Sequence, residues 1–303
     1  MSSTVVVLAG GTGGAKLARG MLDVVSPDEL VVVVNTGDDL EIYGAYVSPD
    51  PDLVTFWLAD LIDERGWGLA EDTFNTMQGL RELGVDVWFN LGDRDLAIGI
   101  ERARTLADGG RLTDAHAAIA AALGVSARVL PMTDNPVRTR VMAHGRWWPL
   151  QEFLIKRRGD GPVDGVDFRG AKAAAPTPEV FEALAGARAI VIGPSNPVIS
   201  IGPILAIEGI RQAIRESTAP VVAVSPLVHG TVVKGPTEPF MAWSGRPMNS
   251  NGIASVYANL IDGLVADQRA DELPTLETDV LMDTPAARAR VAGETLRFAL
   301  GLG

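Results

Sequence analysis

The sequence predicts an α/β protein with a Rossmann-like, three-layer α/β/α core, in which helices cover both faces of a mainly parallel sheet. Short β-branched runs alternate with longer stretches of helical periodicity, which is the pattern of parallel strands joined by crossover helices. The strand-like runs are almost continuously apolar, as expected for strands buried on both faces. A chain of 303 residues fits one large core with a smaller inserted subdomain.

Five apolar runs are the best strand candidates, and helical periodicity fills most of the gaps between them. The predicted strands are residues 5–8, 31–34, 85–89, 189–192 and 221–224. The predicted helices are residues 15–25, 54–63, 73–83, 113–123, 178–184, 204–216, 253–264 and 286–300.

The alternation changes between about residues 125 and 170. Three short strand-like runs occur there, at 127–131, 138–143 and 147–155, with turns and no helical stretch between them. We therefore expect a smaller inserted α+β subdomain, and the predicted organisation is residues 1–110 and 175–303 as the Rossmann-like core with residues 111–174 as the insertion.

Composition excludes several classes of function. The chain has 26 Lys and Arg against 38 Asp and Glu, a net charge of −12, and no dense basic stretch, which argues against nucleic-acid binding. The lack of cysteine excludes disulfides, zinc-thiolate sites and thiol nucleophiles. Without a signal-peptide-like start or a long apolar run, we expect a cytoplasmic protein that does not enter a membrane.

The first predicted strand leads into a glycine-rich loop and then a helix. Backbone N–H groups of such a loop can surround a phosphate at the positive end of the helix. The loop matches neither the dinucleotide fingerprint nor the Walker A motif, and the alternative is a tight turn whose small residues only allow packing. The residues expected to contact an anionic substrate are Gly11, Thr12, Gly13, Gly14 and Lys16.

Two adjacent aspartates follow the second predicted strand, and two more occur within the next fourteen residues or so. Mg²⁺ typically takes one or two carboxylates together with waters and phosphate oxygens. We assign Asp38 and Asp52 as direct Mg²⁺ ligands. Asp39 and Asp50 would lie next to these ligands without touching the metal, and Asn35 would contact the substrate. The alternative is that these aspartates only form turns and helix caps.

The loops after the other predicted strands are also polar, and in a parallel sheet all such loops emerge at one edge. An Arg between two aspartates can hold a phosphate or only form ion pairs, and a lone Lys can contact phosphate or only solvent. Together the loops predict a site for a phosphorylated nucleotide and a metal. The residues concerned are Asp93, Arg94, Asp95, Ser195, Asn196, Ser200 and Lys234.

A flat substrate ring would need an apolar slot beside these polar loops. Six aromatic side chains are candidates for it, although large aromatics equally suit a plain core. They are Trp88, Phe89, Trp147, Trp148, Phe153 and Trp243.

The ordered set of segments resembles the 2-phospho-L-lactate transferase family of coenzyme F-420 biosynthesis, including its actinobacterial phosphoenolpyruvate transferases. The resemblance extends to about Asp271, and its segments are residues 10–15, 35–39, 49–52, 91–97, 151–153, 194–205 and 234–236. It implies a Rossmann-like homodimer. It also implies Mg²⁺-dependent transfer of a 2-phospholactyl or phosphoenolpyruvyl group from a guanosine diphosphate conjugate to the ribityl hydroxyl of the deazaflavin Fo, which yields (dehydro) coenzyme F-420-0 and GMP.

In this reading Asp38, Asp52 and Arg94 are catalytic, and the base is one of those aspartates or no residue at all. We expect Fo to bind between the sheet edge and residues 125–170. The sequence does not distinguish phospholactyl, phosphoenolpyruvyl and phosphoglyceryl donors. The alternative is a non-enzymatic regulatory protein of the same fold that binds nucleotide-sugars. Three segments argue against it because they follow the transferase pattern, namely residues 92–97, 151–153 and 234–236.

Overall fold

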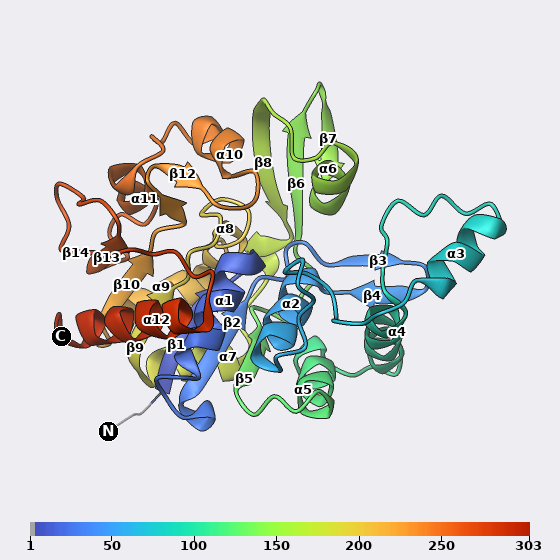
Figure 1. The fold of residues 1–303 in the computed structure, drawn as a ribbon, viewed down its shortest axis with the longest axis horizontal. Coiled ribbons are helices and arrows are strands. Elements are labelled where there is room, and N and C mark those ends of the chain that lie inside the picture. The colour runs from blue at the N-terminus through green and yellow to red at the C-terminus, as the bar shows by residue number, and fades with distance from the viewer. Residues whose placement is uncertain (1–3) are drawn as a thin grey trace.

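The computed structural model describes residues 4–303 and is built around one seven-stranded sheet (Figure 1). All neighbouring strands of this sheet pair in parallel, so the predicted α/β class and parallel core are confirmed. In spatial order the strands are β14 (Thr275–Glu277), β13 (Gly263–Ala266), β10 (Val221–Val224), β9 (Ala187–Ile192), β1 (Thr4–Ala9), β2 (Leu30–Val34) and β5 (Arg128–Pro131).

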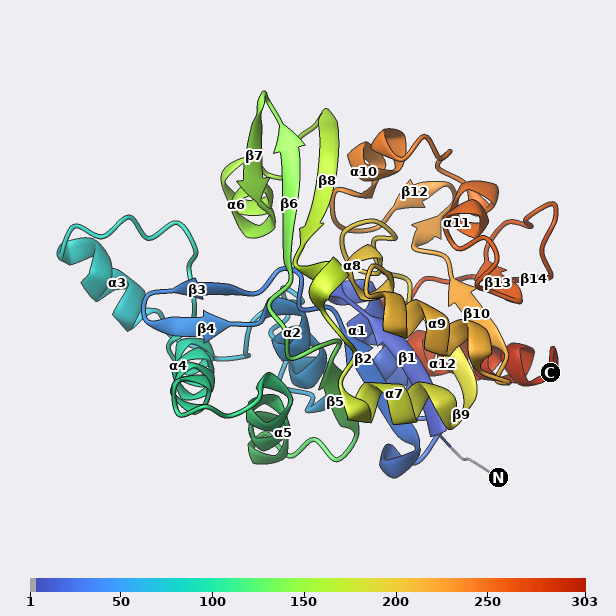
Figure 2. The same cartoon turned by 180° about the vertical axis from the view of Figure 1, so that it is seen from behind.

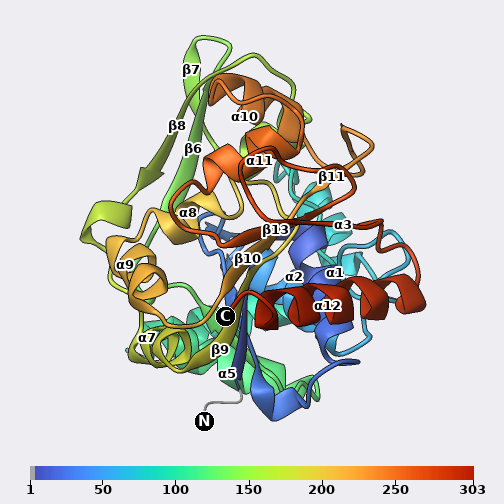
Figure 3. The same ribbon diagram turned by 90° about the vertical axis from the view of Figure 1, so that its left-hand side faces the viewer.

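Helices cover both faces of the sheet, and alternate residues of β1 divide between the two cores. Val6 and Leu8 pack with one buried cluster, whereas Val5 and Val7 pack with the other. Figures 2 and 3 show the two helical layers on opposite sides of the strands. The first layer contains α7 (Pro178–Ala185), α8 (Gly202–Leu205), α9 (Glu208–Glu216) and α11 (Ser250–Val256); the second contains α1 (Gly11–Met21), α2 (Pro49–Leu58) and α12 (Pro285–Leu300).

Between β2 and β5 the chain leaves the sheet and forms a lateral extension (Figure 1). A small buried cluster, which includes Met77, Leu91 and Leu96, holds this extension together. Its elements are β3 (Leu40–Ile42), β4 (Ala45–Val47), α3 (Asn75–Glu82), α4 (Asp93–Ala107) and α5 (Leu112–Ala122).

The predicted strand at residues 85–89 is wrong. These residues form an irregular connection between α3 and α4, and Val85 is 40% exposed. Such a short apolar run has no periodicity that separates a sheet strand from a loop packed on a small core. The helix α4 that follows was not predicted.

A second, three-stranded antiparallel sheet contains β6 (Arg138–Ala143), β7 (Arg146–Pro149) and β8 (Val163–Arg169). The run at 138–143 is a strand as predicted, but the run at 147–155 becomes helix α6 (Leu150–Lys156) after Pro149. The run at 127–131 forms β5 at the edge of the central sheet. The boundaries of the inserted subdomain stay a prediction.

The remaining elements are short and are spread along the chain. The predicted helix at 253–264 is wrong in its second half, because α11 ends at Val256 and β13 begins at Gly263. The short elements are η1 (Pro27–Glu29), η2 (Ala171–Ala173), β11 (Leu227–Val228), β12 (Thr231–Val232) and α10 (Thr237–Trp243). Within residues 4–303, no helix has the length and apolar character needed to cross a membrane.

Two glycines of the first loop are required by geometry. Gly11 has a φ of +63°, in the left-handed region that favours glycine. A Cβ on Gly13 would lie 1.9 Å from the backbone oxygen of Pro194, so the loops after β1 and β9 touch there without any space for a side chain. The small residues of this turn are therefore required for packing against the loop after β9, independently of any ligand.

We expect Gly13→Ala to lower the free energy of unfolding by about 3 kcal/mol, because the Cβ must displace backbone atoms of Pro194. Gly79→Ala in α3 is the matched control, since a Cβ there meets nothing within 4 Å and alanine favours the helix by up to about 1 kcal/mol. Urea denaturation of both variants measures the difference. Equal stability of the two variants would contradict the close contact.

Candidate functional site

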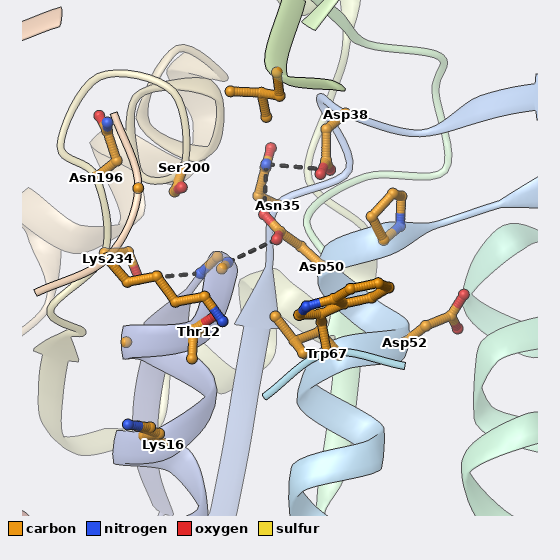
Figure 4. A pocket seen from close by; sticks show the side chains of 18 of the residues that line it. Thr12, Lys16, Asn35, Asp38, Asp50, Asp52, Trp67, Asn196, Ser200 and Lys234 are labelled. Carbon is orange, nitrogen blue, oxygen red and sulfur yellow. Dashed lines mark hydrogen bonds between the residues drawn. The ribbon is translucent and has the colours of Figure 1, made fainter. Parts of the chain in front are cut away.

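A cavity of about 500 Å³ opens at the carboxyl edge of the central sheet. The loops after β1, β2, β9 and β10 line it, together with parts of α2, α6 and the lateral extension (Figure 4). Most of the predicted site residues line the cavity, namely Gly11, Thr12, Gly13, Lys16, Asn35, Asp38, Asp50, Asp52, Asp95, Ser195, Asn196, Ser200 and Lys234. Gly14, Asp39, Asp93 and Arg94 are not among its lining residues.

Asp50 connects the glycine loop to the acidic segment. Its Oδ1 accepts a hydrogen bond from the Gly11 N–H at 2.6 Å, and its Oδ2 accepts one from Asn35 Nδ2 at 2.9 Å (Figure 4). The first N–H group of α1 therefore already donates to a carboxylate of the protein itself. Thr12 and Gly13 come next in the first helical turn and line the cavity, so their N–H groups suit an anionic ligand.

Asp38 lies beside Asp50 and shares a neighbour with it. Asn35 Nδ2 also approaches Asp38 Oδ1 at 3.4 Å, and Gln151 Nε2 donates to Asp38 Oδ2 at 2.9 Å. Within residues 4–303, the side chains and N–H groups that donate hydrogen bonds to these two carboxylates are all neutral. Both carboxylates are buried, so their negative charges lie together in a region of low polarity.

The ionisation of these groups reflects that arrangement. Burial raises the pKa of Asp38 well above its usual value, and the charges of Asp50 and Asp39 raise it further. Burial also raises the pKa of Asp50 to about 6, against the opposing hydrogen bonds from Asn35 and Gly11. A divalent cation between the two groups would relieve this cost.

Asp52 has a different environment, because a buried arginine neutralises it. Both carboxylate oxygens bind the guanidinium of Arg102, which is fully buried in α4 and also donates to the Tyr46 carbonyl at 2.9 Å. Of the two predicted Mg²⁺ ligands, Asp52 is therefore neutralised by Arg102, whereas the side chains that donate to Asp38 within residues 4–303 are neutral. Sequence reasoning missed Arg102, since an arginine fifty residues away on a helix carries no local signal.

Asp39 faces away from the main cavity and holds the β3–β4 hairpin. It accepts hydrogen bonds from Ser48 Oγ at 2.7 Å and from the Tyr46 hydroxyl at 3.0 Å. Burial raises its pKa to about 7. Two side-chain hydroxyls from the start of α2 and from β4 therefore hold the Asp39 carboxylate.

Asp93 and Asp72 cap two helices of the lateral extension. Asp93 accepts from the N–H groups of Asn75 and Thr76, at 3.0 and 2.9 Å, at the start of α3. Asp72 accepts from the N–H groups of Arg94 and Asp95, at 2.9 and 3.1 Å, at the start of α4.

The premise that placed Arg94 at the mouth of a central strand is wrong, because residues 85–89 are not a strand. The Arg94 side chain is exposed and donates to the Ala70 carbonyl at 3.3 Å. Its neighbour Asp95 does line the cavity. Burial, followed by the charges of Asp52 and Asp72, raises the pKa of Asp95 to about 7.

The opposite side of the cavity is polar and cationic. Ser195 Oγ accepts from the Gly10 N–H at 3.3 Å, and Asn196 Oδ1 accepts from two N–H groups of its own loop. Lys16 and Lys234 supply positive charge: partial burial lowers the pKa of Lys16, and the charges of Arg288 and Lys234 lower it further. These groups form a surface suited to phosphate oxygens.

The side formed by α2, α6 and the lateral extension carries large apolar side chains next to polar ones such as Asp95 and Gln151. Phe56, Trp67, Phe74, Phe89 and Leu154 line it. Of the six aromatic candidates from the sequence, only Phe89 lies here, and Trp88 lines a second cavity beside Arg138 and Arg140. Trp67 was missed because it lies in a glycine-flanked loop without periodicity.

The fold and the site are those of an α/β protein with a cavity suited to a phosphate-bearing ligand at the carboxyl edge of its sheet. The sequence profile of the family described as 2-phospho-L-lactate transferase CofD matches residues 5–291. The 2-phospho-L-lactate transferase of Methanosarcina mazei is 40% identical over 270 residues, covering 88% of each chain. A phosphoenolpyruvate transferase of Kitasatospora aureofaciens is 38% identical, covering 95% of this chain and 97% of its own.

The chain therefore belongs to the CofD family of 2-phospho-L-lactate transferases, as the sequence resemblance predicted. It is an enzyme, a transferase of phosphorus-containing groups that acts in coenzyme F-420 biosynthesis. A crystal structure of a Bacillus halodurans protein has a TM-score of 0.58 at 18% identity, and the match covers 97% of this chain and 91% of that one. This likeness shows the shared fold alone.

We expect Arg102→Met to lower the free energy of unfolding by about 3 to 5 kcal/mol, because it leaves the carboxylate of Asp52 buried without a partner. Arg104→Met on the same helix is the control, since Arg104 is 64% exposed and its ion pairs contribute little. Urea denaturation measures both. A loss of less than 1 kcal/mol or so in Arg102→Met would contradict this assignment.

We expect the stability of the metal-free protein to fall as the pH rises from about 4 to about 7. Asp50, Asp39 and Asp95 have folded-state pKa values of about 6, 7 and 7 against an ordinary 3.8, so these groups hold more protons in the folded state, and together they outweigh buried His116, whose pKa of about 3 acts in the opposite direction. Asp38→Asn removes a carboxyl group whose own pKa is raised by burial and by the charges of Asp50 and Asp39, and should make the fall smaller. Urea denaturation in EDTA across this range tests it, and a steeper fall in the variant contradicts the repulsion.

Proposed function

We propose that the enzyme transfers a 2-phospholactyl or phosphoenolpyruvyl group from its guanosine diphosphate conjugate to the ribityl hydroxyl of the deazaflavin Fo. The ribityl oxygen forms a bond to the β-phosphorus while the bond from that phosphorus to GMP breaks, and the hydroxyl proton is released. The main support is the two-sided cavity: a polar, cationic side suits the diphosphate, an apolar side suits the deazaflavin, and two uncompensated carboxylates belong to the same cavity.

The residues fit Mg²⁺, which prefers oxygen ligands and keeps several waters. Within residues 4–303, no group of three or more acidic or histidine side chains forms a complete protein cage, and one or two carboxylates suffice for Mg²⁺. Asp38 would hold the ion, and the shared contact to Asn35 supports Asp50 as its partner. Asp52, the partner predicted from the sequence, would contribute through a free lone pair beside Arg102. When bound, Mg²⁺ neutralises charge on the diphosphate.

The chain's own groups then position the reactants, which is most of the work in a phosphoryl-type transfer. The N–H groups of Thr12 and Gly13 and the ammonium groups of Lys16 and Lys234 would bind the donor. Asp38 or Asp52 would accept the hydroxyl proton, unless it leaves to solvent late in the reaction. Fo would occupy the apolar side, between the lateral extension and α6. The cytoplasmic location and the homodimer stay predictions.

Incubation with Fo, Mg²⁺ and each of the three guanylylated donors, followed by mass spectrometry of the deazaflavin product, tests the proposal. We expect one phospholactyl or phosphoenolpyruvyl product, loss of the product in EDTA, and at least about 100-fold slower turnover in Asp38→Asn. The exposed-site variant Arg104→Met should retain full activity. Undiminished turnover by Asp38→Asn in EDTA would exclude the Mg²⁺ mechanism, and no product with any donor would exclude the proposed reaction.

A further inference from the structure

The position and the exposure of Trp67 point to a ligand contact. It lines the main cavity, and yet 48% of its surface is exposed. Leaving a large aromatic surface in water is unfavourable, and an exposed indole at the mouth of a cavity is typical of a ligand contact. Figure 4 shows Trp67 among the side chains that line the site.

The loop that carries Trp67 is a small, well-braced hairpin. An antiparallel bridge joins Ile62 to Leu69, and the Asp63 N–H donates to the Gly68 carbonyl at 3.0 Å. Gly66 and Gly68, on either side of Trp67, have φ values of +79° and +71°, which L residues rarely adopt. The two glycines therefore fix the turn that presents the indole.

The tip of this hairpin also contacts the opposite rim of the cavity. Lys234 Nζ, from the segment after β12, donates to the Arg65 carbonyl at 3.2 Å. The guanidinium of Arg65 lies 4.5 Å from the centre of the Trp67 ring. The ring is thus held by a cation–π contact, which limits the conformational freedom that ligand binding would otherwise cost.

The aromatic residues of the cavity indicate which ligand the ring meets. Phe56, Phe74 and Phe89 line the cavity along with Trp67, and they come from α2 and the lateral extension. Apolar and polar side chains occur on both sides of the cavity, but these are its aromatic lining residues. An aromatic ligand ring therefore finds aromatic partners on the side of Trp67.

We propose that Trp67 stacks on the flat heteroaromatic ring of the acceptor and so determines acceptor affinity. This inference rests on the proposed function, since it takes the acceptor to be a deazaflavin. The rival ligand is the purine ring of the donor, which also has a face for stacking.

Steady-state kinetics of Trp67→Leu and Trp67→Phe test the proposal, with each substrate varied in turn. We expect Trp67→Leu to raise the KM for Fo by about tenfold and to change the KM for the donor by less than about twofold. Trp67→Phe should keep a KM for Fo close to that of the wild type, because its ring can still stack. Trp243→Leu is the matched control, because Trp243 is 40% exposed and does not line the cavity. It should match the wild type.

Calorimetric titration of the same variants with Fo alone gives a second measurement that needs no turnover. A tenfold larger dissociation constant for Fo in Trp67→Leu, with thermal stability unchanged, supports the proposal. An unchanged affinity for Fo, or a loss confined to the donor, overturns it. Failure of the proposed function is distinguishable from failure of this inference, because it appears in the wild type. The wild type would then bind Fo without forming product, or would not bind Fo at all.

Discussion

The site depends on two buried carboxylates that the protein leaves without a cation of its own. Asp38 and Asp50 meet at the amide of Asn35, and their other contacts come from Gln151 and a backbone N–H. Burial disfavours both charges, so the fold accepts a local cost in stability at the edge of its sheet. A cost of this kind at a ligand-binding edge is expected where a cation arrives together with the substrate.

The neighbouring aspartates show that this arrangement is selective. Asp52 has Arg102, Asp39 has the hydroxyls of Tyr46 and Ser48, and Asp93 receives the first N–H groups of α3. Three acidic residues that look alike in the sequence thus have three different kinds of partner. The lateral extension supplies Arg102 itself, which explains why a segment outside the Rossmann-like sheet is packed against the acidic loop.

The parallel core was predictable because each central strand is a continuous apolar run, and the loop after such a strand has a known destination. That single rule brought Asn35, Ser195 and Lys16 correctly to one cavity. It failed for residues 85–89, where an apolar run packs on the small cluster around Met77 and Leu91. Partners distant in sequence, such as Arg102 for Asp52 and Gln151 for Asp38, have no local pattern, so only the folded chain reveals them.

The charge of the chain makes the division of the cavity necessary. The proposed donor is a diphosphate conjugate, and a protein with a net charge of −12 must concentrate its positive groups where such phosphates would lie, since most of its surface repels them. Partial burial lowers the pKa of Lys16, and the charges of Arg288 and Lys234 lower it further. An anion beside these cations would oppose that shift. The proposed acceptor carries no phosphate and needs no such concentration. In the proposed reaction the two sides of the cavity therefore bind two chemically different reactants next to the same pair of carboxylates.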